Sequence, residues 1–243
     1  MSNPILEVDR ASRTFGGLKA VQEVSFSVEE GEIFGVAGPN GSGKSTLFNL
    51  ITGIPFPPTS GSIVFGGTRI DGKSPHAIAR SGLARTFQKD AEFPDLSARE
   101  TMLIGASYAG GMSGRQAGHA ADDALELVSF PEDRRDVESG HLSVYEKKQL
   151  MIGSALVSNP RILMLDEPAS GLTRPEIAAL DKLLLDVNRT GVTILLIEHV
   201  LSLLLSVSER LLVLNQGQIL ASGDPQEVIR DPKVIEAYLG GRK

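Results

Sequence analysis

Residues 38–46 combine the residue types and the spacing of a phosphate-binding loop. Gly38, Gly43, Lys44 and Ser45 match the pattern of a glycine, four free positions, a second glycine, a lysine and a serine or threonine. Glycines allow successive backbone N–H groups to converge on phosphate oxygens, while the lysine reaches the outer phosphates and the serine hydroxyl can ligate Mg²⁺. The residues predicted to contact a nucleotide here are Gly38, Pro39, Asn40, Gly41, Ser42, Gly43, Lys44, Ser45 and Thr46.

Two adjacent acids, Asp166 and Glu167, follow the apolar run at residues 161–165. An aspartate at the carboxyl end of a buried strand can hold Mg²⁺ beside Ser45, directly or through water. The next carboxylate is then placed to orient or deprotonate a water that attacks the γ phosphate. Adjacent acids before a proline can also be ordinary turn formers, but the phosphate loop favours the functional interpretation.

Three isolated side chains could act with these groups. His199 follows a second apolar run and could contact the γ phosphate, although a lone histidine at a strand end is more often structural. The amide of Gln88 could touch Mg²⁺ or the attacking water, but an exposed glutamine carries little signal by itself. Phe15 could stack on a purine base, and core packing is the alternative.

Ser143 and Glu146 have the spacing of a helix capping box. Capping alone explains this pair without any ligand. The functional alternative is a helix N-terminus that points at the γ phosphate of a nucleotide held by another protomer. The spacing is compatible with both interpretations.

The hydrophobic pattern predicts the elements that must position these residues. A short apolar strand at residues 32–37 precedes the loop, and a helix at residues 47–53 follows it. The apolar runs at residues 161–165 and 192–197 have strand length and are separated by a helical segment, which is typical of a parallel sheet covered on both faces. Further strands are expected at residues 5–8, 24–28 and 61–67, with a closing hairpin at residues 211–221.

The middle of the chain is predicted to be mainly helical, with a loose glycine-containing loop at residues 110–118. We therefore expect an α/β fold: a P-loop NTPase core with a mixed, mostly parallel sheet, an antiparallel β edge lobe and a helical insertion lobe. Residues 1–243 form a single domain in this prediction. Residues 1–88 and 159–243 make the core with its β lobe, and residues 89–158 make the helical lobe.

Length and composition limit the class of protein. The 243 residues suffice for one large domain, and 22% charged with 41% hydrophobic residues is ordinary for a globular chain. A formal charge of −6 gives no electrostatic reason to expect nucleic acid as a partner, and the absence of cysteine excludes disulfides and thiolate metal sites. No secretion signal is evident at residues 1–10, and charged residues interrupt the apolar window 192–214. A cytoplasmic protein is expected.

The order of these motifs resembles the ATP-binding subunit of ABC transporters along nearly the whole chain. The resemblance implies a RecA-like core that hydrolyses ATP with Mg²⁺. It identifies Phe15 as the adenine-stacking aromatic and Gln88 as the residue that couples to the membrane subunit. It also implies that Asp166 and Glu167 are the metal-holding and catalytic acids, that His199 is the switch histidine, and that residues 142–146 are the signature, with Ser143 acting on the partner's nucleotide.

Several stretches are similar to the branched-chain amino acid uptake group within this family, namely residues 15–21, 82–88, 93–96, 198–199 and 236–240. This resemblance implies ATPases that work in pairs, identical or different, against two membrane permease subunits. A separate solute-binding protein would deliver the substrate. The chain would then lie on the cytoplasmic face of the membrane. Lipopolysaccharide-export ATPases share part of the pattern, so the solute is an analogy.

Two departures from the family pattern concern the dimer. Val144 and Tyr145 replace the two glycines of the usual Leu-Ser-Gly-Gly-Gln signature, and Glu146 replaces its glutamine. Tyr145 keeps the backbone N–H that a γ phosphate would need, but it adds bulk at a crowded seam. Thr173 stands at the position where the family often has aspartate and which normally touches the opposite site. These changes are expected to leave nucleotide binding by one protomer intact. Their expected effect is on closure of the dimer, and through it on the rate of hydrolysis.

Three functions follow as hypotheses. The first is an ATPase subunit that drives a membrane permease. The second is a nucleotide-binding regulatory subunit or asymmetric partner in which the altered signature supports little hydrolysis. The third, a soluble ATPase of DNA repair or translation, is disfavoured because the chain has no long heptad segment, second phosphate loop or basic patch.

Overall fold

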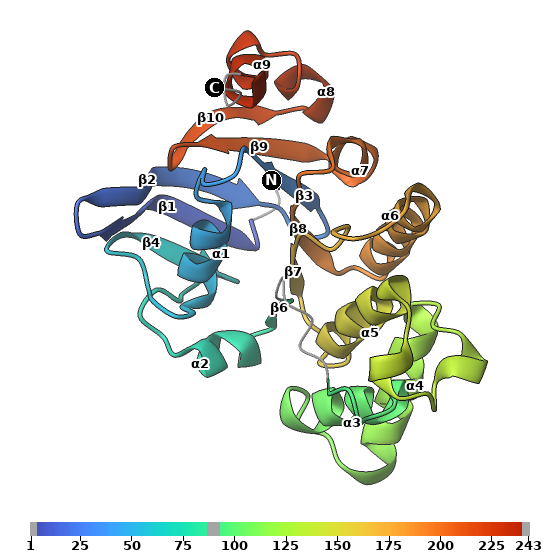
Figure 1. Cartoon of the computed structure of the whole chain (residues 1–243). Helices are drawn as coiled ribbons and strands as arrows, with labels where there is room; N and C mark the ends of the chain where they lie inside the picture. Colours follow the sequence, from blue (N-terminus) through green and yellow to red (C-terminus); the bar gives the residue numbers. More distant parts are fainter. Residues whose placement is uncertain (1–3, 87–92, 240–243) are drawn as a thin grey trace. The chain divides into compact units, whose positions relative to one another are not determined.

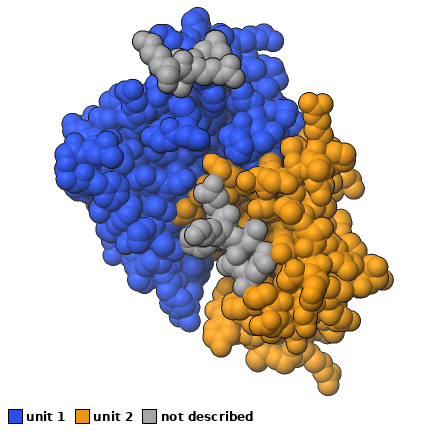
Figure 2. All heavy atoms as spheres, in the orientation of Figure 1, with its two compact units in different colours: residues 1–81, 193–243 blue, residues 82–192 orange. Residues whose placement is uncertain are grey.

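The computed structural model describes residues 4–86 and 93–239, which divide into two compact units (Figures 1 and 2). The first unit comprises residues 1–81 and 193–243, and the second comprises residues 82–192. The sequence-based lobe boundaries, after residues 88 and 158, stay a prediction. Each unit is described by itself below.

An antiparallel β lobe forms one part of the first unit. Strands β1 (Leu6–Phe15) and β2 (Leu18–Val28) pair through a tight turn at Gly16 and Gly17, and β4 (Ser60–Phe65) and β5 (Thr68–Arg69) extend the sheet in the order β2-β1-β4-β5. Alternate residues of β1, such as Leu6 and Val8, are buried. This alternation is the pattern of a strand with one face on a core.

A mostly parallel sheet forms the other part of the first unit. Strand β3 (Ile33–Ala37) runs parallel to β8 (Thr193–Ile197) and to β9 (Arg210–Asn215), and β10 (Gln218–Gly223) closes the edge as the antiparallel partner of β9. Every residue of β3 and β8 is buried. The continuous apolar runs in the sequence therefore correspond to doubly covered strands.

The helices of the first unit follow directly from these strands. They are α1 (Lys44–Thr52), α2 (Pro75–Arg80), α7 (Leu201–Val207), α8 (Pro225–Val228) and α9 (Pro232–Leu239) (Figure 1). Helix α1 is followed by Gly53, whose φ of 67° caps the helix in the left-handed conformation. Among the described residues, no helix combines the length and the apolar character that crossing a bilayer requires.

An ion pair joins the parallel sheet to the β lobe within this unit. The guanidinium of Arg210 donates to the buried carboxylate of Glu32 and, at 2.8 Å, to the carbonyl of Ser27 at the end of β2. It also lies 5.1 Å from the ring centre of Phe34. The hydrogen bond from Arg210 to Glu32 raises the pKa of Arg210, so the guanidinium stays charged. The starts of β3 and β9 are thus tied to β2.

The second unit contains a short parallel pair of strands and a group of helices. Strand β6 (Leu83–Arg85) runs parallel to β7 (Ile162–Asp166). The helices are α3 (Ala98–Tyr108), α4 (Gly114–Leu127), α5 (Val144–Leu156) and α6 (Arg174–Arg189), with short 3₁₀ turns at residues 132–134 and 139–141. The expected glycine loop is shorter than predicted, because α4 already begins at Gly114 and contains Gly118.

Helices α3 and α5 approach each other closely at glycine positions. A Cβ atom added to Gly105 would lie 2.8 Å from Cγ1 of Val157 and 3.1 Å from the carbonyl oxygen of Ser154. Gly118 of α4, in contrast, has no atom within 4 Å of its Cβ position. The first glycine is needed for packing, whereas the second only lowers helix propensity.

These two glycines give opposite predictions for alanine. Gly105→Ala should lower the free energy of unfolding by about 1–3 kcal/mol because it overpacks the α3–α5 contact. Gly118→Ala should raise it by about 0.5–1 kcal/mol through helix propensity. Chemical denaturation of both variants beside the wild type measures this, and equal changes in the two variants would contradict the packing argument.

Candidate nucleotide-binding site

The predicted phosphate loop occupies the turn between β3 and α1. Gly38, Gly41 and Gly43 have φ angles of 145°, 78° and 106°, all in the region that favours glycine. A Cβ on Gly38 would lie 2.2 Å from the carbonyl oxygen of Leu214, and one on Gly43 would lie 2.5 Å from that of Ala20. Both glycines are therefore required by backbone conformation and by close approach of neighbouring strands.

The polar groups of the loop are arranged around its backbone. The buried ammonium of Lys44 donates to the carbonyl oxygens of Gly38 at 2.7 Å and Pro39 at 3.2 Å, so the lysine lies across the loop. The buried Ser42 hydroxyl has no hydrogen-bond partner within the described residues. Helix α1 starts at Lys44 with no acid in its first turn, so its positive end faces the loop. This donor set fits an anionic ligand such as a polyphosphate.

The turn between β9 and β10 supports the loop from the side. The N–H of Gly217 donates to the carbonyl of Ser42 at 2.9 Å. In the same turn, the carbonyl of Gly217 accepts from the backbone N–H of Gln22 in β2, and the carbonyl of Gln216 accepts from the Gln22 side-chain amide. A Cβ on Gly217 would lie 2.8 Å from the carbonyl oxygen of Ala20. Sequence analysis predicted this hairpin but not its contact with the loop, because no pattern links segments about 175 positions apart.

Helix α9 also reaches the start of the loop. Burial raises the pKa of the Tyr238 phenol, and the backbone N–H of Gly38 acts in the opposite direction. Tyr238 is therefore a neighbour of the first loop glycine. Sequence analysis did not single out its side chain.

Two further predicted residues belong to this first unit. Phe15 ends β1 at the tip of the β1–β2 hairpin and is 39% exposed, so it is not a core residue. His199 follows β8, and its side chain is 53% exposed. The fully buried Glu198 accepts hydrogen bonds from the backbone N–H groups of His199 and Val200 at 3.1 and 3.3 Å. A buried carboxylate thus fixes the backbone that presents the imidazole.

In the second unit, the two predicted acids stand at the end of β7. Asp166 is 4% exposed, and one of its oxygens accepts a hydrogen bond from Nη2 of Arg85 at 3.1 Å. Burial lowers the pKa of Arg85, and the charge of Asp166 opposes that change. Glu167 has a φ of 52°, which is uncommon for a residue with a side chain. Sequence analysis gave Arg85 no role of its own.

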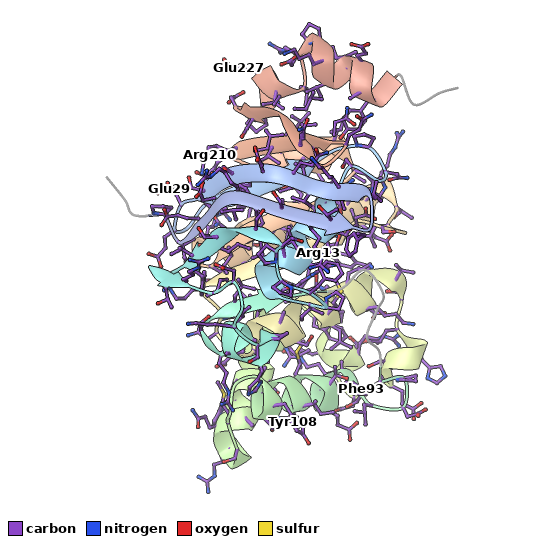
Figure 3. The ribbon with its side chains drawn as sticks, turned by 90° about the vertical axis from the view of Figure 1, so that its left-hand side faces the viewer. Arg13, Glu29, Phe93, Tyr108, Arg210 and Glu227 are labelled. Atoms are coloured by element: carbon purple, nitrogen blue, oxygen red, sulfur yellow. The ribbon has the colours of Figure 1, made fainter. Side chains whose placement is uncertain are left out.

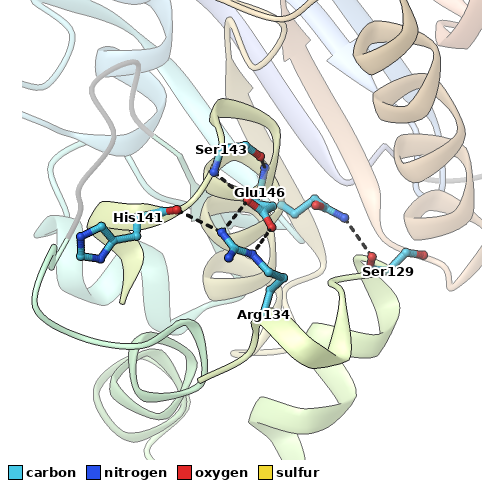
Figure 4. A network of polar contacts seen from close by, with 6 residues as sticks. Ser129, Arg134, His141, Ser143 and Glu146 are labelled. Carbon is cyan, nitrogen blue, oxygen red and sulfur yellow. Dashed lines mark hydrogen bonds and ion pairs between the residues drawn. The ribbon is translucent and has the colours of Figure 1, made fainter. Parts of the chain in front are cut away.

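The capping box at the start of α5 is confirmed, and a wider network surrounds it (Figure 4). The Ser143 hydroxyl accepts from the N–H of Glu146 at 3.2 Å, and the Ser143 N–H donates to the Glu146 carboxylate at 2.6 Å. Arg134 donates to that carboxylate at 2.8 Å and to the carbonyl of His141 at 3.0 Å. Burial alone would raise the pKa of Glu146, but the bonds from Arg134 and Ser143 lower it.

Val144 and Tyr145, which stand where the resemblance predicts the signature glycines, contact their own unit. Tyr145 is half-buried, and burial together with the charge of Glu176 raises its pKa. Glu176 itself caps α6 by accepting from the N–H of Thr173 at 2.7 Å. Val144 is 46% exposed and lies beside Gly171. Tyr145 is thus near the first turn of α6.

The structure therefore brings the predicted residues together in two separate sets. The loop, Phe15 and His199 belong to the first unit, whereas Asp166, Glu167 and Ser143 belong to the second. Gln88 lies outside the described residues. Within those residues, no group of three or more His, Cys, Asp and Glu side chains gathers as a metal site. Ser45 of the first unit and Asp166 of the second each offer an oxygen of the kind that Mg²⁺ takes, and this ion is usually bound through few protein ligands and substrate phosphates.

Known proteins resemble this chain over nearly its whole length. A family model described as ABC transporter matches residues 21–170, and one described as branched-chain amino acid ATP-binding cassette transporter matches residues 218–243. This chain belongs to the ABC transporter family. It is 40% identical to the high-affinity branched-chain amino acid transport ATP-binding protein BraF of Pseudomonas aeruginosa, with 99% of each chain covered. It is 38% identical to the LivG protein of Escherichia coli K12, again with 99% of each covered.

Solved structures give the same family. The ADP conformation of MJ1267, an ATP-binding cassette of an ABC transporter, is 32% identical and matches with a TM-score of 0.89, covering 98% of this chain and all of the other. A nucleotide-free ATP-binding cassette from an ABC transporter matches with a TM-score of 0.87 at the same identity, covering 97% of this chain and 99% of the other. The predictions of a P-loop α/β fold and of a transport-coupled ATP hydrolase are confirmed.

The contact between Gly217 and the loop gives a prediction with a matched control. Gly217 and Gly67 have φ angles of 77° and 73°, so alanine should cost about 1–2 kcal/mol of stability at either position. Only at Gly217 would the methyl group also meet the Ala20 carbonyl, because no atom lies within 4 Å at Gly67. Gly217→Ala should therefore weaken binding of a fluorescent ATP analogue about tenfold by displacing the loop. Unchanged affinity in Gly217→Ala, or an equal loss in Gly67→Ala, would refute this coupling.

Proposed function

We propose that this chain hydrolyses Mg-ATP to drive a membrane permease that takes up branched-chain amino acids. The observation that carries the proposal is the similarity to BraF and LivG over 99% of each chain, which accompanies a loop whose glycines, lysine and helix start all fit phosphate. The match of residues 218–243 to the branched-chain group supports the solute class.

In this proposal, the residues of the first unit bind and orient the nucleotide. Lys44 exchanges the carbonyls of Gly38 and Pro39 for the outer phosphates, and the positive end of α1 favours the same anion. Phe15 stacks on the base, and the half-exposed imidazole of His199 contacts the γ phosphate. The hydrogen bonds from Glu198 keep the histidine backbone in place.

The acids of the second unit serve the hydrolytic step. Ser45 and Asp166 would hold Mg²⁺, which neutralises negative charge on the phosphates, and Gln88 stays the predicted additional amide ligand. Arg85 fixes the direction of the Asp166 carboxylate through its hydrogen bond. Glu167 orients the attacking water and accepts its proton, and the left-handed backbone at this residue is in keeping with a functional position.

The proposed partners are two permease subunits, a second ATPase protomer and, indirectly, a solute-binding protein. The chain would therefore lie on the cytoplasmic face of the membrane. ATP would be held between the loop of one protomer and Ser143 of the other, so hydrolysis separates the pair. The half-buried position of Tyr145 near Glu176 supports pairing, because it reduces the bulk that Tyr145 presents outward.

Replacement of Glu167 tests the proposed hydrolysis and pairing together. Glu167→Gln should retain ATP binding and lose about 10²-fold or more in turnover, because it removes the proton acceptor but keeps the shape. In sedimentation experiments, the variant should form dimers with Mg-ATP and remain monomeric with ADP. Lys44→Ala is the comparison, since it should bind ATP weakly and not dimerise. Hydrolysis at the wild-type rate in Glu167→Gln would exclude this residue as the base.

The solute class needs a separate experiment. We expect leucine, isoleucine or valine, together with the solute-binding protein, to stimulate ATP hydrolysis by this chain in vesicles with its permease. Basic and acidic amino acids are the controls. Hydrolysis stimulated by a lipid, or by none of these solutes, would contradict the proposed uptake of branched-chain amino acids while leaving the ATPase assignment in place.

A further inference from the structure

A cluster of two aromatic rings and one arginine lies at the tip of the β1–β2 hairpin. The ring centres of Phe15 and Phe56 are 4.8 Å apart, with an interplanar angle of 72°. The guanidinium of Arg13, which is labelled in Figure 3, lies 4.9 Å from the ring centre of Phe15 and 4.3 Å from that of Phe56. One cation therefore covers both rings.

The arginine is fixed in this position by the chain that follows α1. Its Nη1 donates to the carbonyl oxygen of Pro57 at 3.0 Å, and its buried Nε has no hydrogen-bond partner among the described residues. A planar guanidinium that is held at one end and stacked on rings loses little additional freedom when a ligand arrives. Phe15 nevertheless stays 39% exposed, so part of its ring remains open to a ligand.

The cluster is also close to the phosphate loop through the backbone of β2. The carbonyl of Ala20 lies against Gly43, while Leu18, two residues before it, pairs with Phe15. Two strand residues span about 7 Å. From the other side, Phe56 and Pro57 follow the helix that begins with Lys44. Both segments that carry the rings are thus anchored to the residues that hold phosphate.

We infer that Arg13 and Phe56 complete a purine platform with Phe15, in which Arg13 holds the Phe15 ring on one side and leaves the other side to stack the base of ATP. This inference rests on the proposed nucleotide site and adds two residues that determine its base specificity. A cation above an aromatic ring draws electron density toward itself. The ring then stacks more favourably on an electron-rich purine than on a smaller pyrimidine. Arg13 is accordingly a positioning residue that acts through Phe15.

Binding of nucleotides and of inorganic tripolyphosphate separates this role from simple support of the fold. Arg13→Met keeps a long apolar side chain and removes the cation, and Phe56→Leu keeps an apolar residue and removes the ring. Each should weaken ATP and ADP about fivefold and reduce the preference for ATP over CTP, with tripolyphosphate affinity unchanged. Arg80→Met, at an exposed position on α2 in the same unit, is the matched control and should bind all ligands as the wild type does.

The outcomes distinguish this inference from the function on which it rests. Unaltered ATP affinity in both variants, or a parallel loss for ATP and tripolyphosphate, would overturn the purine platform. Phe15→Leu is the reference variant. It should lose more ATP affinity than Arg13→Met or Phe56→Leu and should bind tripolyphosphate with unchanged affinity. If the wild type bound tripolyphosphate but showed no preference among ATP, CTP and tripolyphosphate, the platform would be wrong and the loop assignment would stand. If the wild type bound none of them, the proposed nucleotide site itself would fail.

Discussion

The site depends on close approach of backbone to backbone around the phosphate loop. The carbonyl of Leu214 comes so near Gly38, and that of Ala20 so near Gly43, that neither position has space for a Cβ atom. Because carbonyl groups from β9 and β2 fix the loop, its shape exists before any ligand arrives. A preformed loop avoids most of the ordering cost that a flexible segment would add to binding.

The same constraint explains why strands distant in sequence serve one small site. Strand β3 is paired on both sides, with β8 and β9, so the point where the loop begins is fixed by two parallel neighbours. The β9–β10 turn then bonds to Ser42 through Gly217. The ion pair of Glu32 and Arg210 holds the opposite end of these strands against β2. Each contact limits movement of the loop relative to the hairpin that carries Phe15.

Sequence reasoning succeeded where the signal is local. The loop pattern, the apolar runs of β3, β7 and β8, and the Ser143–Glu146 cap all depend on residues within a few positions of one another, and the structure contains each of them. It failed where a contact joins distant segments. Nothing in the spacing indicates that Arg85 bonds to Asp166, and only the three-dimensional pairing of β6 with β7 reveals it. The start of α4 was predicted too late for a different reason. Gly114 and Gly118 lie within this helix, but glycines are more common in loops and therefore favoured a loop prediction.

Glu146 places a negative charge where the resemblance predicts a neutral glutamine, and a neighbouring arginine compensates that charge. A carboxylate in the first turn of α5 stabilises the helix, but it also reduces the positive potential that would attract phosphate at this end. Nε of Arg134 lies 2.8 Å from the Glu146 carboxylate, so a positive charge stands beside the first turn of α5. Its second bond, to the carbonyl of His141, holds the guanidinium beside the segment that precedes Ser143. The acid and the arginine together therefore carry no net charge at the start of α5, as a neutral amide in place of Glu146 would.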